Sequence, residues 1–573
     1  MICKETHYSP TAGRRNRRWR VCFLLGAALL AGPVLAQTTT DNEVLRQRTQ
    51  REAEERLRQQ QAPDVRLPRP EAAPDADATD LPTETPCYPI DQLNLEGERL
   101  QSFTFLQRAL DAYAGRCIGR EGLNRIVKRL SAQVVAEGYV TTRIGIPEQD
   151  LGSRRLRLLL VPGVVRAIRL ADDTPAGDWR SAFPLRPGDL LQLRDLEQGL
   201  EQMKRIPSQE VDISIVPGDT PGESDLVIHV KRQKPWRLGV TLDDAGSRST
   251  GKLQASASLS IDNPLGVNDL FSVSLNNDAE RDHASGGTRG YGFQYAVPWG
   301  YWTLSLAENK SHYRQTIQGI NQTFATSGDT INDEIRLQRL IQRGQFSKTS
   351  LQFRALRREQ HSFIEDAEIM VQRRNTAAAE LGIVHRHYLG SAQLDLTYAQ
   401  RIGVPWFGGQ RDAANHAAGS ATYDYRLQTL DVSLQAPFRL GDQSLRWNAA
   451  LRGQASKNVL YTSDQFAIGN RYTVRGFDGE RTLAAEQGWY LRNEIEIPLA
   501  ASGQALYLGL DHGHVSGPGA AQLAGRSLTG AVVGARGAAF GLNYDLFAGW
   551  ALAKPDGFAT QRPVVGFQLS TLF

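Results

Sequence analysis

Residues 253–262 have the sequence LQASASLSID, and this alternation decides how the C-terminal part of the chain folds. Leucine, alanine or isoleucine occupies every second position, with glutamine, serine or aspartate between them. Successive side chains of a β-strand point to opposite faces of the sheet, so this strand would have one apolar face and one polar face. The pattern predicts an amphipathic strand whose polar face contacts water.

The same period of two recurs between residues 236 and 573, for example in residues 271–276, 430–435 and 506–511. Serine, aspartate and glutamine on the polar face fit a water-filled barrel better than a soluble sandwich. Membrane-spanning strands need about 9–11 residues, so about sixteen strands with their turns and loops fit this length. We therefore predict a transmembrane β-barrel of about sixteen antiparallel strands over residues 235–573.

The composition sets limits on the class of protein. The 573 residues carry a net charge of +4, which is too small to indicate a nucleic-acid partner. The mean hydropathy is −0.39, and beyond residue 36 no apolar run approaches the roughly 18 residues that a membrane helix requires. A helical membrane protein is excluded, whereas barrel strands average out as polar and remain possible.

The N-terminus predicts export. Five arginines between residues 14 and 20 precede an apolar core at residues 21–30, and Val34-Leu35-Ala36 provides a cleavage site for a signal peptide over residues 1–36. The alternative is a buried first helix. Cleavage would leave Cys87 and Cys117, which in an exported chain most simply form one disulfide, the alternative being two free buried thiols.

Residues 41–61 predict a helix without an apolar face, rich in Glu/Arg pairs at i,i+4 spacing. Its length of about 30 Å is close to the thickness of a bilayer core. Residues 37–61 would therefore plug a polar barrel lumen or form a solvated tail, and the sequence leaves both open. Residues 62–86 contain six prolines and predict an extended linker that reaches about 75 Å.

Two small α/β units should lie between this linker and the barrel. In residues 87–163 we predict a first strand near residues 90–95, helices at 105–113 and 121–137, and strands at 139–146 and 156–161. Residues 164–234 repeat the order in reduced form, with strands at 164–170, 211–216 and 226–230 and a helix at 195–205. Neither unit contains a catalytic constellation.

A loop over about residues 461–484 carries the candidate functional motif Val474-Arg475-Gly476-Phe477. The glycine permits a sharp turn, and the phenylalanine gives the tip an apolar anchor. Asp511 lies on the polar face of a later strand, so the loop could fold into the lumen and bring Arg475 onto this carboxylate. In a wet lumen such a pair would contribute about 0–1 kcal/mol. The alternative is an extracellular arginine unrelated to a solvated aspartate.

Two other motifs are weak indications of chemistry. Gly246–Lys252 has the spacing of a phosphate loop, but Leu253 stands where serine or threonine should bind magnesium, and the segment joins two strands. Asp511 and His512 should point to opposite faces of one strand, which argues against a metal site. We therefore expect no enzymatic activity, cofactor, metal, nucleotide or nucleic-acid ligand.

Taken together, these features resemble the outer-membrane transporters of two-partner secretion, the TpsB family of ShlB/FhaC/HecB haemolysin secretion and activation type. The resemblance covers essentially the whole mature chain. It is carried by the following stretches: Cys87-Tyr88-Pro89-Ile90, Gly138-Tyr139-Val140-Thr141-Thr142-Arg143, Pro147-Glu148-Gln149, Asp262-Asn263-Pro264-Leu265-Gly266, Val474-Arg475-Gly476-Phe477 and Tyr490-Leu491-Arg492-Asn493-Glu494.

The resemblance implies a monomer in the lipid of the Gram-negative outer membrane, with two POTRA domains in the periplasm. These would capture an unfolded TpsA-type exoprotein (a haemolysin, adhesin or contact-dependent toxin), and the barrel would export it to the cell surface without ATP. Arg475 becomes the tip of the sixth extracellular loop, Asp511 its lumenal partner, and residues 37–61 the plug. The family motif often ends in tyrosine, so Phe477 lacks a hydroxyl there.

Two alternatives remain. A barrel-assembly insertase shares the loop and the POTRA type, but usually has more POTRA domains and lacks the plug. A passive porin would consist of a barrel alone, and the two α/β units argue against it.

Overall fold

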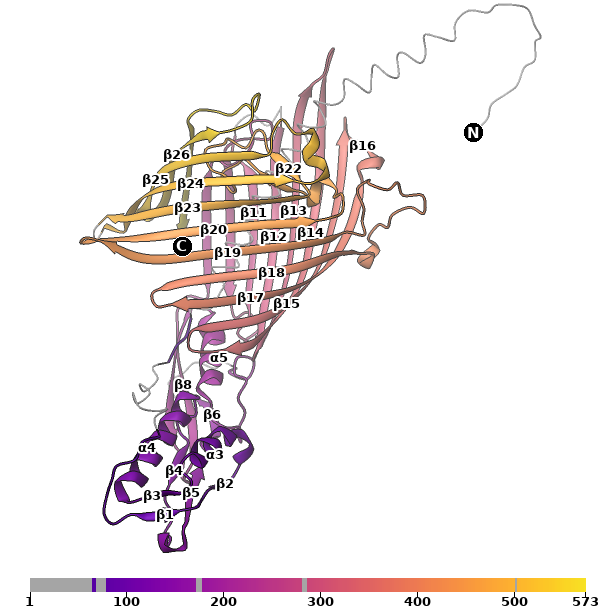
Figure 1. The fold of residues 1–573 in the computed structure, drawn as a ribbon. Coiled ribbons are helices and arrows are strands. Elements are labelled where there is room, and N and C mark those ends of the chain that lie inside the picture. The colour runs from indigo at the N-terminus through magenta and orange to yellow at the C-terminus, as the bar shows by residue number, and fades with distance from the viewer. Residues whose placement is uncertain (1–63, 68–78, 172–177, 281–285, 500–501) are drawn as a thin grey trace, which may run out of the picture.

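The computed structural model describes residues 64–67, 79–171, 178–280, 286–499 and 502–573. The predicted signal peptide (1–36) and plug (37–61) lie outside the described residues. Figure 1 shows a large barrel with two small α/β units strung beneath it. None of the helices in the described part is long and apolar enough to cross a membrane.

The described strands form a closed antiparallel barrel of sixteen strands, which confirms the predicted fold class. The last strand pairs with the first, and the two-residue strand β16 (Ala367–Glu368) adds to β15 at its outer end. The barrel strands are β9 (Trp236–Asp243), β10 (Gln254–Asp262), β11 (Leu270–Asp278), β12 (Gly286–Trp299), β13 (Trp302–Gln318), β14 (Thr323–Arg343), β15 (Ser347–Ile364), β17 (Arg374–Leu389), β18 (Ala392–Val404), β19 (Arg426–Leu440), β20 (Gln443–Ser456), β23 (Gln487–Leu499), β24 (Gln504–Ser516), β25 (Ser527–Ala539), β26 (Leu542–Ala553) and β27 (Val564–Leu572).

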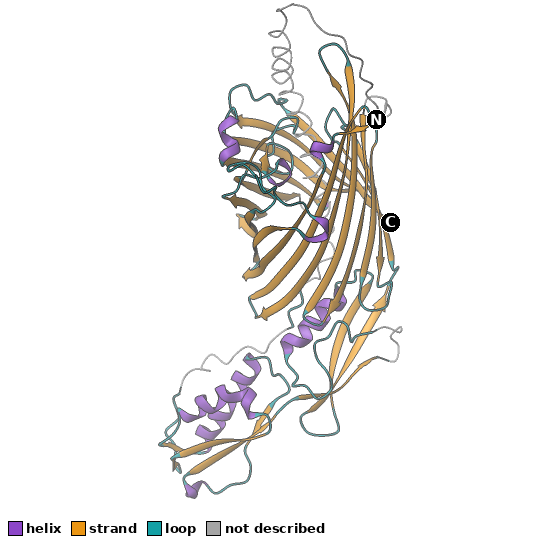
Figure 2. Cartoon of the chain, turned by 90° about the vertical axis from the view of Figure 1, so that its right-hand side faces the viewer, coloured by secondary structure: helices purple, strands orange, loops and turns teal. Residues whose placement is uncertain are grey.

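Several strands are longer than a bilayer requires. Strands β13, β14 and β15 have 17, 21 and 18 residues, against the roughly 9–11 that a tilted membrane strand needs. They extend past the rest of the barrel rim on the side away from the α/β units (Figures 1 and 2). The wall is therefore uneven, and its tall part lies opposite the strands β24–β26 that follow the sixth loop.

The first α/β unit contains β1 (Tyr88–Ile90), β2 (Gln92–Gly97), α3 (Thr104–Asp111), β3 (Arg116–Ile118), α4 (Arg120–Ala136), β4 (Arg143–Gly145) and β5 (Arg155–Val161). Both predicted helices are present, but the strand expected over residues 139–146 is only the three residues of β4. The helices pack on the sheet β2-β5-β4 around a core that includes Phe103, Ile126 and Leu158.

A disulfide joins Cys87 to Cys117, as predicted from the two cysteines left after export. It links the start of β1 to β3, which pair as a small antiparallel sheet. Closing a loop of 30 residues should stabilise this unit by about 3–4 kcal/mol in the chain-entropy model.

The second α/β unit contains β6 (Val164–Leu170), α5 (Leu193–Lys204), β7 (Gln209–Pro217) and β8 (Glu223–Arg232), which lie close to the predicted elements. Its sheet has the order β6-β8-β7, so β7 is an edge strand within the described residues. Buried residues of α5, among them Leu196 and Leu200, pack on Leu226 and Ile228 of β8 in the core of this unit.

The second unit is joined to the barrel through α5, which lies between the two (Figure 2). The Nε2 atoms of Gln198 and Gln202 donate to the carbonyl oxygen of Gly300, in the turn between β12 and β13, at 3.0 and 3.2 Å. The backbone N–H of Ser208 donates to Asp262 at the end of β10 (2.9 Å), and Arg237 pairs with the same carboxylate. These contacts identify the rim with short turns as the side that carries the α/β units.

The described parts of the proline-rich linker, which the sequence predicted as an extended segment, lie against folded elements. Residues 64–67 contact α5 and the barrel. The carboxylate of Glu84 accepts hydrogen bonds from the backbone N–H groups of Gly119, Glu121 and Gly122 at the start of α4. Burial acts to raise the pKa of Glu84, but these N–H groups favour the charged form and hold that pKa below its ordinary value.

Candidate functional site in the barrel lumen

The segment between β20 and β23, residues 457–486, folds into the barrel and carries the Val-Arg-Gly-Phe motif. It contains a short antiparallel pair, β21 (Phe466–Ile468) with β22 (Leu483–Ala485), that the sequence did not predict. The motif lies between these two strands. Counted along the chain, this segment is the sixth connection on the rim away from the α/β units, as the resemblance implied.

An apolar cluster holds the loop inside the barrel. Val474 and Phe477 of the motif are buried together with Phe466, Ile468 and Leu483 of the loop. The cluster also includes wall and surface-loop residues, namely Tyr490, Val515, Ala520, Leu528, Ala551 and Phe558. The rings of Phe477 and Phe558 meet edge to face with centroids 5.8 Å apart. This part of the lumen is therefore a packed core and not a water-filled channel.

Arg475 and Asp511 lie together in the structure. The Nε atom of Arg475 is 2.7 Å from Oδ2 of Asp511, and Nη2 is 2.9 Å from Oδ1, which is the bidentate arrangement. The backbone N–H of Arg475 also donates to Oδ2 at 3.0 Å. The aspartate therefore fixes both the side chain and the backbone of the loop tip.

The expectation of a wet ion pair was wrong. Arg475 is 6% exposed and Asp511 is fully buried. Arg475 also contacts Glu494 of β23, whose second carboxylate oxygen lies 2.8 Å from Arg536 of β25. A buried pair gains little net stability from its charges, but removing one partner costs about 3–5 kcal/mol because it leaves the other uncompensated. The estimate of about 0–1 kcal/mol for a solvated pair therefore does not apply.

Glycines in the barrel wall form the seat for the loop tip. A Cβ atom at Gly530 of β25 would lie 1.8 Å from the carbonyl oxygen of Arg475, and one at Gly509 of β24 would lie 2.5 Å from Nη2 of Arg475. Gly476 has a φ of +98° and packs against the backbone of Trp550 in β26, so this position of the motif requires glycine on two grounds. The close approach of two backbones thus depends on missing side chains on both sides.

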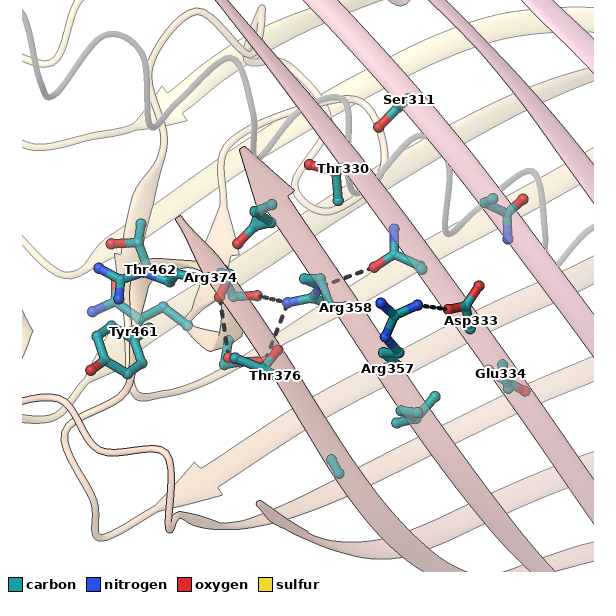
Figure 3. A pocket seen from close by; sticks show the side chains of 18 of the residues that line it. Ser311, Thr330, Asp333, Glu334, Arg357, Arg358, Arg374, Thr376, Tyr461 and Thr462 are labelled. Carbon is teal, nitrogen blue, oxygen red and sulfur yellow. Dashed lines mark hydrogen bonds and ion pairs between the residues drawn. The ribbon is translucent and has the colours of Figure 1, made fainter. Parts of the chain in front are cut away.

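A polar cavity of about 660 Å³ lies beside the loop (Figure 3). Arginines of β15 and β17 line it, among them Arg357, Arg358 and Arg374. Tyr461 and Thr462 of the loop segment line it beside Arg374, whose guanidinium lies 4.0 Å from the ring centroid of Tyr461. Arg358 donates to the carbonyl oxygen of Ser463 at 2.9 Å, and Arg357 pairs with Asp333 at 3.0 Å. The loop tip is thus seated on the wall β23–β26, whereas the start of the loop segment contacts β15, and the polar space lies towards the wall β13–β17.

The sequence reasoning missed Glu494 and the wall glycines. Glu494 stood in a stretch that carried the family resemblance, but it received no role because its strand position does not reveal which loop reaches it. Gly530 lies among apolar residues of β25. A glycine at such a position can also be an ordinary weakly packed strand residue, so the sequence alone does not show that another backbone approaches it. His512 and His514, on the other face of β24 from Asp511, hydrogen-bond to Thr529 and Ser527.

A sixteen-stranded barrel with two small α/β units on one rim and an arginine-tipped loop sealed into its lumen defines a class of outer-membrane protein transporter. Comparison with known families supports this class. Residues 222–537 match the family described as haemolysin secretion/activation protein ShlB/FhaC/HecB. Residues 88–163 match the ShlB-type POTRA domain, and residues 164–217 match a second POTRA domain.

The chain belongs to the ShlB/FhaC/HecB family, and it is an outer-membrane transporter of the two-partner secretion type. It is 44% identical to outer membrane transporter CdiB-2 of Burkholderia pseudomallei strain 1026b, over 91% of this chain and 92% of that protein. It is 28% identical to the haemolysin transporter protein ShlB of Serratia marcescens, over 80% and 81% of the two chains. The solved structure of CdiB from Acinetobacter baumannii superposes with a TM-score of 0.82 at 28% identity, covering 93% of this chain and 99% of that chain. The POTRA domains of this family lie in the periplasm.

Proposed function

We propose that the partner of this transporter is an unfolded exoprotein of the contact-dependent toxin class. The proposal is supported by the 44% identity to a CdiB-2 transporter along nearly the whole of both chains. Of the partner classes that the family resemblance implied, the haemolysin type is represented by a relative at the lower identity of 28%. Co-expression with exoproteins of the toxin type and of the haemolysin type tests the assignment: the toxin type should appear at the cell surface, and surface export of the haemolysin type alone would refute it.

The observation that carries the transport mechanism is the seat of the loop tip on the wall β23–β26. The loop tip is sealed against β23–β26 by Arg475, while the polar cavity faces the opposite wall. An extended polypeptide would pass along the polar wall while the seated loop keeps the rest of the lumen closed. Arg475 and Asp511 would then act by setting the position of the loop and not by chemistry on the cargo.

Capture would begin at the edge strand β7 of the second POTRA domain. Within the described residues β7 pairs only with β8, and its Ile215 and Val216 are exposed. An unfolded chain can add to such an edge as a further strand, with main-chain hydrogen bonds giving affinity and alternate side chains giving selectivity. The sequence has no nucleotide motif, so folding of the cargo outside the cell would drive passage through a single barrel acting as a monomer.

The experiment compares two substitutions of exposed apolar residues. Ile215→Lys places a charge on the edge strand β7, whereas Leu159→Lys places one on the central strand β5 of the first POTRA domain. We expect Ile215→Lys to reduce secretion of the partner strongly and Leu159→Lys to leave it near the wild-type level. Removing Cys87 to Val230 altogether should abolish secretion while the barrel still inserts. Export at the wild-type level by the bare barrel would refute capture by the POTRA domains.

A further inference from the structure

The four residues Asp64–Leu67 occupy a site at the joint between the second POTRA domain and the barrel. The site is built from α5 and from the rim ends of β14, β15 and β17. Val65 is buried in the core of the second POTRA domain, and Leu67 packs on the same core. These two residues alternate with Asp64 and Arg66, which face charged and aromatic groups.

Two backbone hydrogen bonds hold the segment in place. The N–H of Leu67 donates to Oε1 of Glu197 on α5 at 3.0 Å. The carbonyl oxygen of Val65 accepts from Nη2 of Arg343, at the end of β14, at 2.7 Å. The backbone is therefore recognised by one residue from the POTRA domain and by one from the barrel.

The polar side chains of the segment contact the barrel rim. A carboxylate oxygen of Asp64 lies 3.1 Å from Nη1 of Arg386, and Asp64 also pairs with Lys348. The guanidinium of Arg66 lies 3.9 Å from the ring centroid of Tyr388. Burial acts to raise the pKa of Asp64, but Lys348 and Arg386 outweigh it and hold that pKa below its ordinary value.

Each charged partner of the segment also has a charged partner within the folded domains. Lys348 lies 2.9 Å from Glu201 of α5, and Arg386 lies 2.5 Å from Asp395 of β18. Arg343 pairs with both Glu197 and Glu201. If the segment left, no charge of the site would lose its last counter-ion. Such a site can release and rebind its ligand, in contrast to a structural strut.

We propose that α5 and the rim ends of β14, β15 and β17 form a binding site for an extended peptide, acidic at its first position and aliphatic at its second and fourth. Asp64–Leu67 is the resident ligand, and it leaves the site during export. The first statement stands on the contacts alone, whereas the second rests on the proposed function.

The position of the site suggests how docking and release of Asp64–Leu67 could be coupled to export. Residue 63 is covalently attached to Asp64, so the chain towards residues 37–61 starts at the barrel rim and not at the first POTRA domain. Capture of cargo that shifts α5 would displace Glu197 and Glu201 together, and thereby loosen the site. This coupling would connect cargo arrival at the POTRA domains to release of the N-terminal part.

Docking is tested first by thiol labelling of the full-length transporter. Val65→Cys introduces a thiol at the buried position, and Thr83→Cys provides an exposed control in the same linker. We expect the thiol at position 65 to react with maleimide far more slowly than the thiol at position 83. Adding Asp64→Asn to Val65→Cys should raise the labelling rate by no more than about fivefold, because the ion pair it removes is one between partly exposed groups. Equal labelling at positions 65 and 83 would overturn the docked site.

Release is tested by a reversible bridge. Asp64→Cys and Lys348→Cys are joined by a short bismaleimide with a reducible centre, and each single variant treated alike serves as a control. We expect export to be lost while the bridge is intact and to return on reduction, with heat resistance in SDS confirming a folded barrel. Export at the level of the single variants despite the bridge would overturn release. If deleting residues 37–61 leaves the single-channel conductance unchanged, the prediction that these residues plug the pore is wrong. Slow labelling of the thiol at position 65 would still support the docked site in that case.

Discussion

The sixth loop and the segment Asp64–Leu67 are both attached to the barrel through acid–base contacts, but the two attachments differ in what they would leave behind. All hydrogen bonds to the buried Asp511 carboxylate that the structure shows come from Arg475. Withdrawal of the loop would therefore leave a buried carboxylate without a cation. Withdrawal of Asp64 leaves Lys348 beside Glu201 and Arg386 beside Asp395.

The energetic consequence of this difference is large. An uncompensated buried charge costs about 3–5 kcal/mol, whereas an ion pair between partly exposed groups contributes about 0–1 kcal/mol. The segment does gain from burying Val65, which is worth about 1.5–3 kcal/mol relative to exposure. The loop is thus expected to stay seated, while the segment is expected to exchange. Similar charged residues serve as a permanent attachment in one place and as a releasable one in the other.

The largest effect is expected from Arg475→Ala. It leaves Asp511 buried and unpaired, so the seated loop should lose about 3–5 kcal/mol relative to an unseated one. We expect the loop to become sensitive to added protease and secretion to fall sharply, while the barrel still inserts and resists heat in SDS. Asp511→Ala should also impair secretion, and the double variant should be no worse than either single variant. Wild-type secretion by Arg475→Ala at normal barrel abundance would contradict a positioning role for the loop.

The next largest effect is expected from filling the space that the wall glycine Gly530 leaves for the loop tip. Gly530→Ala places a Cβ atom where the carbonyl oxygen of Arg475 lies, which should cost about 1–3 kcal/mol as overpacking. Gly453→Ala on β20 is the matched control, since the nearest atoms to its Cβ are 3.9 Å away. We expect Gly530→Ala to expose the loop to protease and Gly453→Ala to have no effect. Equal protease sensitivity of the two variants would show that the close backbone approach does not hold the loop.

A smaller effect is expected from substitutions that test whether Glu201 can replace Asp64 as the counter-ion of Lys348 when the segment Asp64–Leu67 leaves its site. Asp64→Asn alone should lower the melting temperature little, because Lys348 keeps Glu201. In a Glu201→Gln background the same change removes the second carboxylate from Lys348, so the two substitutions should be coupled by about 0.5–3 kcal/mol. Thermal unfolding of the four proteins in detergent measures this coupling. Strictly additive shifts would mean that the two carboxylates do not substitute for each other.

The smallest effect concerns the other attachment of the linker, at Glu84. Because the folded-state pKa of Glu84 is below its ordinary value, its stabilising contribution is present above about pH 4.5 and is lost as the pH falls through the folded pKa. Hydrogen exchange at Gly119, Glu121 and Gly122 should therefore be faster in Glu84→Gln than in wild type at neutral pH. The two proteins should converge at acidic pH. A difference that persists unchanged at acidic pH would rule out the charge as its cause.

The periodic features of the fold were predictable because their cause is local. Alternation in residues such as 253–262 requires only that one face of a strand meets water and the other does not. The helical spacing in α4 and α5 follows the same logic at a different period. The errors were where alternation was interrupted. The strand predicted over residues 139–146 shrank to β4, and the hairpin β21–β22 inside the sixth loop was not foreseen.

The candidate site was predictable only in part. The motif residues and Asp511 could be paired because alternation places Asp511 in the lumen and the family resemblance places Arg475 there. Their burial could not be foreseen, since it depends on the apolar cluster that Phe477 and Phe558 form across the lumen. The estimate for a solvated pair consequently assumed the wrong surroundings.

By itself, the sequence determined the barrel, the two α/β units, the disulfide and the loop motif, because each follows from a local period, a residue count or a contiguous stretch. Only the tertiary structure decided which charges are buried, which glycines receive the loop and where the linker is attached. Those properties arise from contacts between residues far apart in the chain, such as Val65 and Arg343 at a separation of 278 positions. Burial changes the energy of a charge pair several-fold, and no local pattern reports it.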